Sequence, residues 1–384
     1  THYPAPFMAA VMSADMDNTD KIVTLVDECG NMGIDILPPD VNAGHYKFTV
    51  NEDNQIVYGI GAVKGVGEGP IEAIIKARIE GGPFVDLFDF CARLDLKKTN
   101  KRVLEKLIKA GAMDNLGPHR AALFETLPEA IKAADQHAKA QALGQDDLFG
   151  LINEQPEDTR QAFKAVTQWP EEVWLNGEKE TLGLYLTGHP INRYLSEIKH
   201  YASGRLVSMQ PTNKDKTTVA VGLVLGVRVM VNKRGRRWAL VTLDDKSARI
   251  DIRLFPDDYD TFAELLVTDA ILVCSGQVSF DEYSGGITMT ARDIMTIADA
   301  RENYVTSLDI HVKRAAIGNN FIEKFSQVLS PFKDGTCPVR VFYQREEAQG
   351  MLELGVQWRV TPEDALLHEL RTLLGEECLA LQFK

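Results

Sequence analysis

The sequence predicts a multidomain α+β protein, in which a helical half is followed by a β-barrel and a small α+β domain. Three observations support this fold class. Apolar residues recur at helical spacing through most of 59–143. Short β-rich runs separated by turn residues begin near residue 217. Strand and helix patterns then alternate over residues 302–384.

Length, charge and cysteine usage limit the classes of protein. The 384 residues are enough for roughly two to four domains. The net charge of −13 argues against a chain that coats itself in nucleic acid, but it allows local basic surfaces. No apolar run reaches the roughly 18 residues that span a membrane, so we expect no membrane partner. The five scattered cysteines predict free thiols in a reducing cytoplasm and no zinc site.

The N-terminal residues predict helices and then a hairpin. Residues 1–37 are expected to be helical, with Asn18 capping a helix that has one apolar face. Apolar residues alternate on both sides of the turn NEDN, which predicts a hairpin over 45–58.

A glycine-rich turn in KGVGEGPIEAIIKAR, 64–78, is the strongest local signal. Its glycines precede an apolar-periodic helix, which is typical of a helix-hairpin-helix motif. Such glycines let the backbone approach a phosphate, and N–H groups at the helix start point at the anion. The alternative is a tight turn between packed helices. The predicted contacts with duplex DNA are Lys64, Gly65, Val66, Gly67, Gly69, Lys76 and Arg78.

A second, less regular glycine turn lies within 103–123 and suggests a paired motif. Here His119 and Arg120 could reach a phosphate, and the alternative is a solvated turn. Residues 144–170 predict a loop, in which the apolar pair Leu148-Phe149 belongs either to the core of this protein or to the surface of another. The segment 174–195 is expected to be helical in its second half.

Five β-rich runs over 218–297, with one helical insert at 259–267, have the element order of an OB-fold barrel. The loop between the first two strands reads NKRGRRW and is strongly basic. Basic loops and aromatic platforms together bind single-stranded nucleic acid. The alternative is that the aromatic residues, Phe255 above all, fill the barrel. The predicted single-strand contacts are Lys233, Arg234, Arg236, Arg237 and Trp238.

Residues 302–384 predict strand, helix, three strands, helix and strand, with the last of the three middle strands at 357–362. The paired acids fit caps and turns better than two-metal catalysis, which needs acids converging from rigid elements. They are Asp15 with Asp17, Asp244 with Asp245, and Asp257 with Asp258. We therefore predict no catalytic residue and no metal ligand in the chain, and a structural role for His189.

Several collinear segments together resemble one family. They include HYPAPFMAAVMSADMDNTDKI, YGIGAVKGVGEGPIEAII, LEKLIKAGAMDNLGPHRAAL and TLGLYLTGHPINRYL. In this order they resemble the C-terminal part of the bacterial replicative DNA polymerase III alpha subunit, in its proteobacterial form. The resemblance implies five parts. Residues 1–57 would be the end of a fingers domain, and residues 58–155 a tandem helix-hairpin-helix domain that grips duplex DNA and carries the clamp contact. A helical connector (156–203) would lead to an OB domain that meets single-stranded template (204–300) and to a domain that docks the tau subunit of the clamp loader (301–384).

The resemblance also implies partners and an absence. The family's sliding-clamp peptide, a glutamine, two variable residues and an apolar pair, corresponds here to Gln145, Asp146, Asp147, Leu148 and Phe149. The family's catalytic aspartates and their Mg²⁺ belong to a palm domain upstream, so this chain alone is expected not to polymerise and to hold no cofactor. The start at Thr1 suggests a fragment of the holoenzyme subunit. The alternative is a standalone helix-hairpin-helix and OB adaptor that binds DNA in repair.

Overall fold

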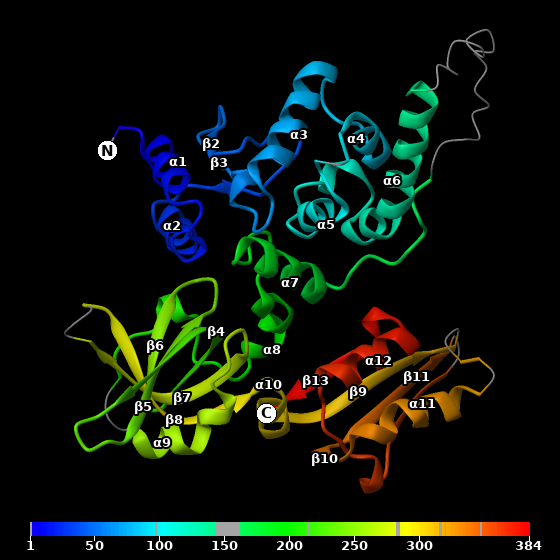
Figure 1. Ribbon diagram of the computed structural model, residues 1–384. Helices are drawn as coiled ribbons and strands as arrows, with labels where there is room; N and C mark the ends of the chain where they lie inside the picture. Colours follow the sequence, from blue (N-terminus) through cyan, green and yellow to red (C-terminus); the bar gives the residue numbers. More distant parts are fainter. Residues whose placement is uncertain are drawn as a thin grey trace. The chain divides into compact units, whose positions relative to one another are not determined.

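The computed structural model describes residues 2–96, 98–142, 162–212, 216–281, 285–314, 317–318, 320–345 and 348–384. They form two compact units, Thr1–His189 and Pro190–Lys384, which are described separately (Figure 1). The predicted clamp peptide, residues 145–149, lies outside the described residues. The observed elements confirm the multidomain α+β fold class.

The first unit is mostly helical. Its helices are α1 (Pro4–Ala14), α2 (Thr19–Asn31), α3 (Glu68–Gly81), α4 (Leu87–Arg93), α5 (Lys101–Lys109), α6 (Arg120–Ala142) and α7 (Glu171–Leu182). As predicted, Asn18 caps α2, because its side-chain oxygen accepts the N–H of Lys21 at 3.2 Å. The predicted hairpin is also present, as β2 (Thr49–Val50) paired with β3 (Ile56–Val57).

Two local expectations for this unit were wrong. Residues 36 and 37 are not helical but form β1 (Ile36–Leu37), which pairs in parallel with β3 through backbone contacts that no local pattern reveals. In 174–195 the α-helix occupies the first half, not the second. Gly183 ends α7 in the left-handed conformation, with φ of 82°. The later part holds the 3₁₀ turn Pro190–Tyr194, and only its last residue, Leu195, begins the short helix α8 (Leu195–Ile198).

One buried cluster of apolar side chains holds the first unit together. It runs from Ala5 in α1 to Leu184 beyond α7, and it includes Tyr58, Phe90 and Leu107. The residues before and after position 57 therefore share a single core. The five-part division of the chain stays a prediction.

The second unit contains the predicted closed barrel, with strands β4 (Thr218–Val231), β5 (Arg237–Asp244), β6 (Arg249–Leu254), β7 (Ile271–Phe280) and β8 (Ile287–Thr296). The strand order is β4-β5-β6-β8-β7, and α9 (Pro256–Phe262) lies between β6 and β7 in sequence. This is the OB-fold arrangement that the sequence predicted. Alternate residues of β5, such as Ala239 and Val241, point into a fully buried core.

The C-terminal part of this unit is a four-stranded sheet with helices. The sheet order is β12 (Ala348–Glu353), β11 (Val339–Arg345), β9 (Val305–Lys313) and β13 (Leu379–Phe383), and the helices are α10 (Ile297–Tyr304), α11 (Phe321–Leu329) and α12 (Asp364–Leu374). The strand predicted at 357–362 was wrong. A 3₁₀ turn occupies Val356–Trp358, and Val360 forms isolated bridges with Lys333 and Cys337 at either end of the short strand β10 (Lys333–Cys337).

A buried arginine joins three parts of the second unit. Arg301 of α10 is 3% exposed and donates to both carboxylate oxygens of Glu197, each at 2.7 Å. Glu197 lies in the short helix α8 (Leu195–Ile198). Arg301 also donates to Asp364 at the start of α12 at 2.8 Å. The sequence did not reveal this link, because its members are 63 and 104 positions from Arg301.

Candidate nucleic-acid interface

The glycine-rich turn lies between the 3₁₀ turn Ile60–Ala62 and the start of α3. Gly65 has φ of 73°, a left-handed conformation that glycine adopts at low cost. Gly65, Gly67 and Gly69 are exposed, whereas Val66 is 5% exposed and anchors the turn in the core. A Cβ at Gly67 or Gly69 would meet open space or only the ring of Pro70. The turn thus presents backbone at the surface, as a phosphate-binding turn requires.

The basic residues near this turn have different environments. Lys64 is exposed, and its backbone N–H donates to the carbonyl of Thr181 at 2.8 Å. Lys76 is exposed, and its Nζ lies 3.8 Å from Glu80 Oε1. Arg78 instead donates to the carbonyls of Val41 and Gly44 at 2.8 and 2.9 Å, and burial lowers its pKa. Arg78 therefore holds the loop at 41–44 against α3.

Lys106 of α5 is a cation that the sequence did not single out. A Cβ built on Gly65 would lie 2.1 Å from Lys106 Nζ, so this ammonium group lies directly over the turn. A clue was available in KRVLEKLIK, where basic residues recur along a helix of the second predicted motif. The turn therefore has positive charge from Lys64 and from Lys106.

The second predicted motif holds the domain together. His119 Nδ1 accepts the N–H of Ala122 at 3.1 Å and so caps α6. Arg120 is 9% exposed, and all three of its guanidinium nitrogens donate within the protein, to Asp114 and Glu178. Burial acts to lower the pKa of Arg120, but the two carboxylates outweigh it and raise that pKa. The predicted phosphate contact of Arg120 would need these bonds to open.

The basic loop of the barrel is a tight turn between β4 and β5. Asn232 Oδ1 accepts the N–H groups of Arg234 and Arg236 at 2.9 and 3.0 Å, and Gly235 has φ of 77°. Lys233, Arg234, Arg236 and Arg237 are all exposed. Arg236 differs from the others because it pairs with Asp257 and Asp260 of α9 at 2.7 and 3.0 Å. Its charge is thereby compensated.

The aromatic residues beside this loop lie outside the barrel core. Trp238 alternates with the buried Ala239 and is half-buried on the outer side of β5. Ala239 pairs with Leu254, so Trp238 and Phe255 lie at the same end of the barrel. Phe255 is 50% exposed, which shows that the alternative in which it fills the barrel was wrong. Exposed rings beside a basic loop can provide stacking surfaces for bases.

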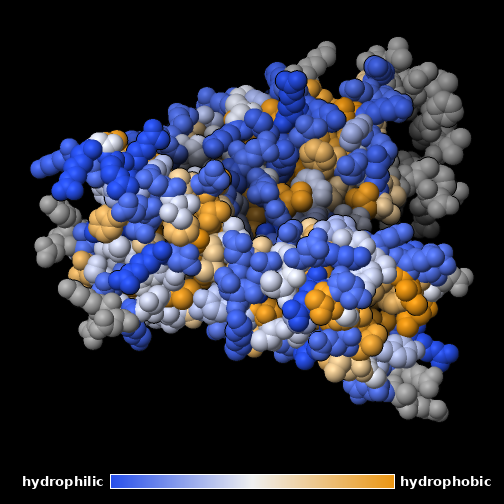
Figure 2. All heavy atoms as spheres, turned by 90° about the horizontal axis from the view of Figure 1, so that it is seen from below, coloured by the Kyte–Doolittle hydropathy of each residue, from blue (hydrophilic) through white to orange (hydrophobic). Residues whose placement is uncertain are grey.

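The face of the molecule drawn in Figure 2 is mainly polar. Figure 2 shows hydrophilic residues over most of the face seen from below, with hydrophobic residues in small groups between them. Among the described residues, no group of three or more His, Cys, Asp or Glu could hold a metal ion, and no helix is long and apolar enough to cross a membrane. The five cysteines are buried and free.

Comparisons with known families agree with this arrangement. Residues 33–123 match the family described as "Helix-hairpin-helix motif", and residues 218–297 match "OB-fold nucleic acid binding domain". The fold and its surfaces thus define a multidomain nucleic-acid-binding protein. Residues 324–375 match "DNA polymerase III subunit alpha, C-terminal domain".

Whole-chain relatives give the family. The chain is 55% identical over its full length to the DNA polymerase III subunit alpha of Vibrio cholerae and 57% identical to that of Escherichia coli K12. It belongs to the family of bacterial DNA polymerase III alpha subunits and corresponds to their C-terminal region. It spans about a third, 33%, of the length of these relatives.

Proposed function

We propose that the chain is the part of a replicative polymerase that holds DNA and tethers the enzyme, in the cytoplasm of a bacterium. It binds primer-template DNA through the glycine-rich turn and the barrel loop, contacts the sliding clamp through residues 145–149, and docks the tau subunit through 301–384. One observation carries this proposal: a chain of the polymerase III alpha family exposes both a glycine-rich turn in its helix-hairpin-helix region and a basic loop on its OB-fold barrel.

The two proposed DNA-binding surfaces suit different forms of DNA. Exposed glycine backbone with Lys64 and Lys106 suits the phosphates of duplex DNA, because N–H groups and ammonium groups recognise phosphate without reading sequence. The barrel loop with Trp238 suits single-stranded template, because stacking needs unpaired bases.

The clamp contact follows α6 in the sequence. The last residue of α6 is Ala142, and the peptide Gln145-Asp146-Asp147-Leu148-Phe149 begins three positions later in the sequence. Two apolar side chains inserted in a preformed pocket, with an amide fixing the register, form a small but specific anchor. We also propose that this chain carries no polymerase centre of its own and that Mg²⁺ acts elsewhere in the subunit.

A charge-neutralisation series tests the single-strand contact. We expect Lys233→Gln with Arg234→Gln and Arg237→Gln to weaken single-strand binding and to flatten the plot of log K against log salt. Three lost phosphate contacts at about 0.7 each give a change in slope of about 2. The measurement is fluorescence anisotropy of a labelled single-stranded oligonucleotide at several salt concentrations.

Arg236→Gln is the matched control, because Asp257 and Asp260 already compensate its charge. We expect Arg236→Gln to change the salt slope less than Lys233→Gln, Arg234→Gln or Arg237→Gln does when each is made singly. An unchanged slope in the triple variant would show that the loop does not touch the DNA backbone. Primer-template duplex without an overhang should bind the triple variant and the unmodified chain equally.

A further inference from the structure

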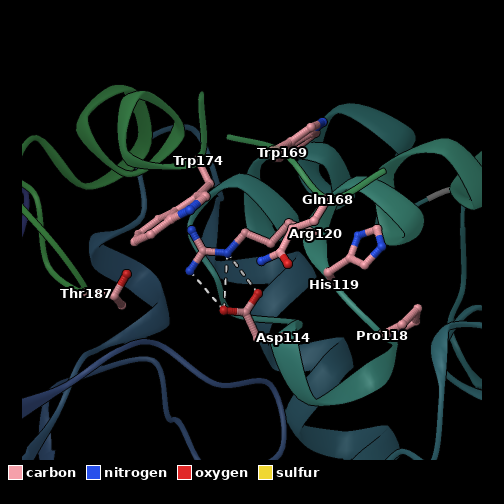
Figure 3. Close-up of a pocket in the computed structure, with 8 residues that line it drawn as sticks. All are labelled: Asp114, Pro118, His119, Arg120, Gln168, Trp169, Trp174 and Thr187. Atoms are coloured by element: carbon pink, nitrogen blue, oxygen red, sulfur yellow. Dashed lines mark hydrogen bonds and ion pairs between the residues drawn. The ribbon is translucent and has the colours of Figure 1, made fainter. Parts of the chain in front are cut away.

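The first unit contains a cavity of about 300 Å³ that the proposed contacts with duplex and clamp do not use. It opens beside the start of α6 and the start of α7, and its walls include His119, Gln168, Trp169 and Trp174 (Figure 3). This volume lies at the lower end of the range for small-ligand pockets.

Two indole rings are held in place in the cavity wall. The Trp169 ring packs against the Phe124 ring, with centroids 5.5 Å apart. The Trp174 ring packs over the Arg120 guanidinium, which lies 5.3 Å from the ring centroid. Both tryptophans are only half-buried. Fixed and partly exposed rings offer stacking surfaces that cost little ordering entropy when a ligand binds.

The charges in the cavity select against a phosphate. In Figure 3 the Arg120 side chain runs between the two indoles and the Asp114 carboxylate. Arg120 gives its donors to Asp114 and to Glu178, which is 0% exposed, so its charge is compensated. The Asp114 side chain is 44% exposed and would repel an anion. The cavity therefore disfavours an anionic group such as a phosphate.

The polar groups in the wall suit a ring with N–H donors. The Asp114 carboxylate can accept from an amino group, and the Gln168 amide can both donate and accept. A nucleobase has this combination of a flat aromatic face and an edge of donors and acceptors.

We propose that this cavity binds one unpaired base of single-stranded DNA, stacked against Trp169 or Trp174. The proposal rests on the DNA-binding function argued above and adds a base-recognition site outside the barrel. The glycine-rich turn would contact the duplex, and this cavity would take a base that has left the stack.

Photocrosslinking of the full chain tests the site. A primer-template with a single-stranded overhang carries 5-iododeoxyuridine at successive overhang positions, and crosslinked peptides are identified by mass spectrometry. We expect crosslinks to Trp169 or Trp174 at one overhang position. An abasic residue at that position should lower affinity on the order of tenfold, since base stacking on an aromatic side chain gives a contribution of that size.

Two variants separate stacking from folding. Alanine in place of the tryptophan that crosslinks, Trp169→Ala or Trp174→Ala, should lower affinity for the overhang substrate by about the same factor as the abasic residue. Phenylalanine at the same position should restore most of it, because both rings can stack. Circular dichroism checks that both variants fold.

The outcomes separate the two proposals. Normal DNA binding with crosslinks only in the barrel, at Trp238, and no effect of the abasic residue, of Trp169→Ala or of Trp174→Ala would overturn the base site alone. The same result would leave the DNA-binding function standing. Absence of DNA binding by the unmodified chain would overturn the proposed function and the base site together.

Discussion

Leu148→Ala combined with Phe149→Ala is expected to remove clamp binding while leaving affinity for DNA unchanged. A buried anchor residue typically accounts for about 2 kcal/mol or more, which is roughly thirtyfold in affinity. A short peptide that binds weakly by itself cannot lose two anchors and remain measurable. Surface plasmon resonance on immobilised clamp provides the measurement, and anisotropy with primer-template DNA provides the comparison.

A neighbouring apolar pair supplies the matched control. Leu151→Ala with Ile152→Ala removes two apolar side chains from the same stretch of sequence but outside the five-residue peptide. We expect this control to keep clamp binding. Equal loss in both double variants would show that the contact is a general apolar one, and retained binding in the first variant would contradict the peptide assignment.

Arg301→Ala is expected to destabilise the second unit by about 3–5 kcal/mol, because it leaves the buried carboxylate of Glu197 without its partner. Urea unfolding followed by circular dichroism measures the change. Combining Arg301→Met with Glu197→Met should recover much of the loss, since an apolar pair of similar volume can replace a buried ion pair.

The exposed Arg236 provides the comparison. Its pairs with Asp257 and Asp260 lie at the surface, where solvent screens them, so Arg236→Ala should destabilise the second unit far less than Arg301→Ala does. Equal losses of stability for Arg301→Ala and Arg236→Ala would contradict the assigned role of Arg301.

Acid should also weaken the link between Arg301 and Asp364. Although burial acts to raise the pKa of Asp364, Arg301 and Tyr194 lower it overall. Stabilisation from this pair is therefore present above about pH 4 and is lost as the pH falls through the lowered pKa.

Local sequence patterns predicted the elements whose causes are local. The cap at Asn18, the hairpin at β2 and β3, and the five barrel strands with α9 before β7 all follow from capping residues, turn residues and alternation. The elements that failed depend on distant partners. The strand at 36–37 exists because β3 lies beside it, and the expected strand at 357–362 became a turn whose Val360 bridges β10.

The candidate site shows the same division. The exposed glycines of the first turn and the basic barrel loop were visible in the sequence. The sequence could not show that the guanidinium groups of Arg78 and Arg120 would donate hydrogen bonds within the protein, since their acceptors come from other segments. Nor could it show that Lys106 would lie over Gly65. Charge alone does not distinguish an arginine that binds a ligand from one that holds a fold together.

Affinity for a clamp already loaded on primed DNA tests the central claim most directly. If the chain links two modest contacts, it should bind the loaded clamp on the order of 10²–10⁴ times more tightly than it binds the clamp alone or the DNA alone. Leu148→Ala with Phe149→Ala should bring that affinity back to the value for DNA alone. An affinity no greater than that of the stronger single contact would contradict the account.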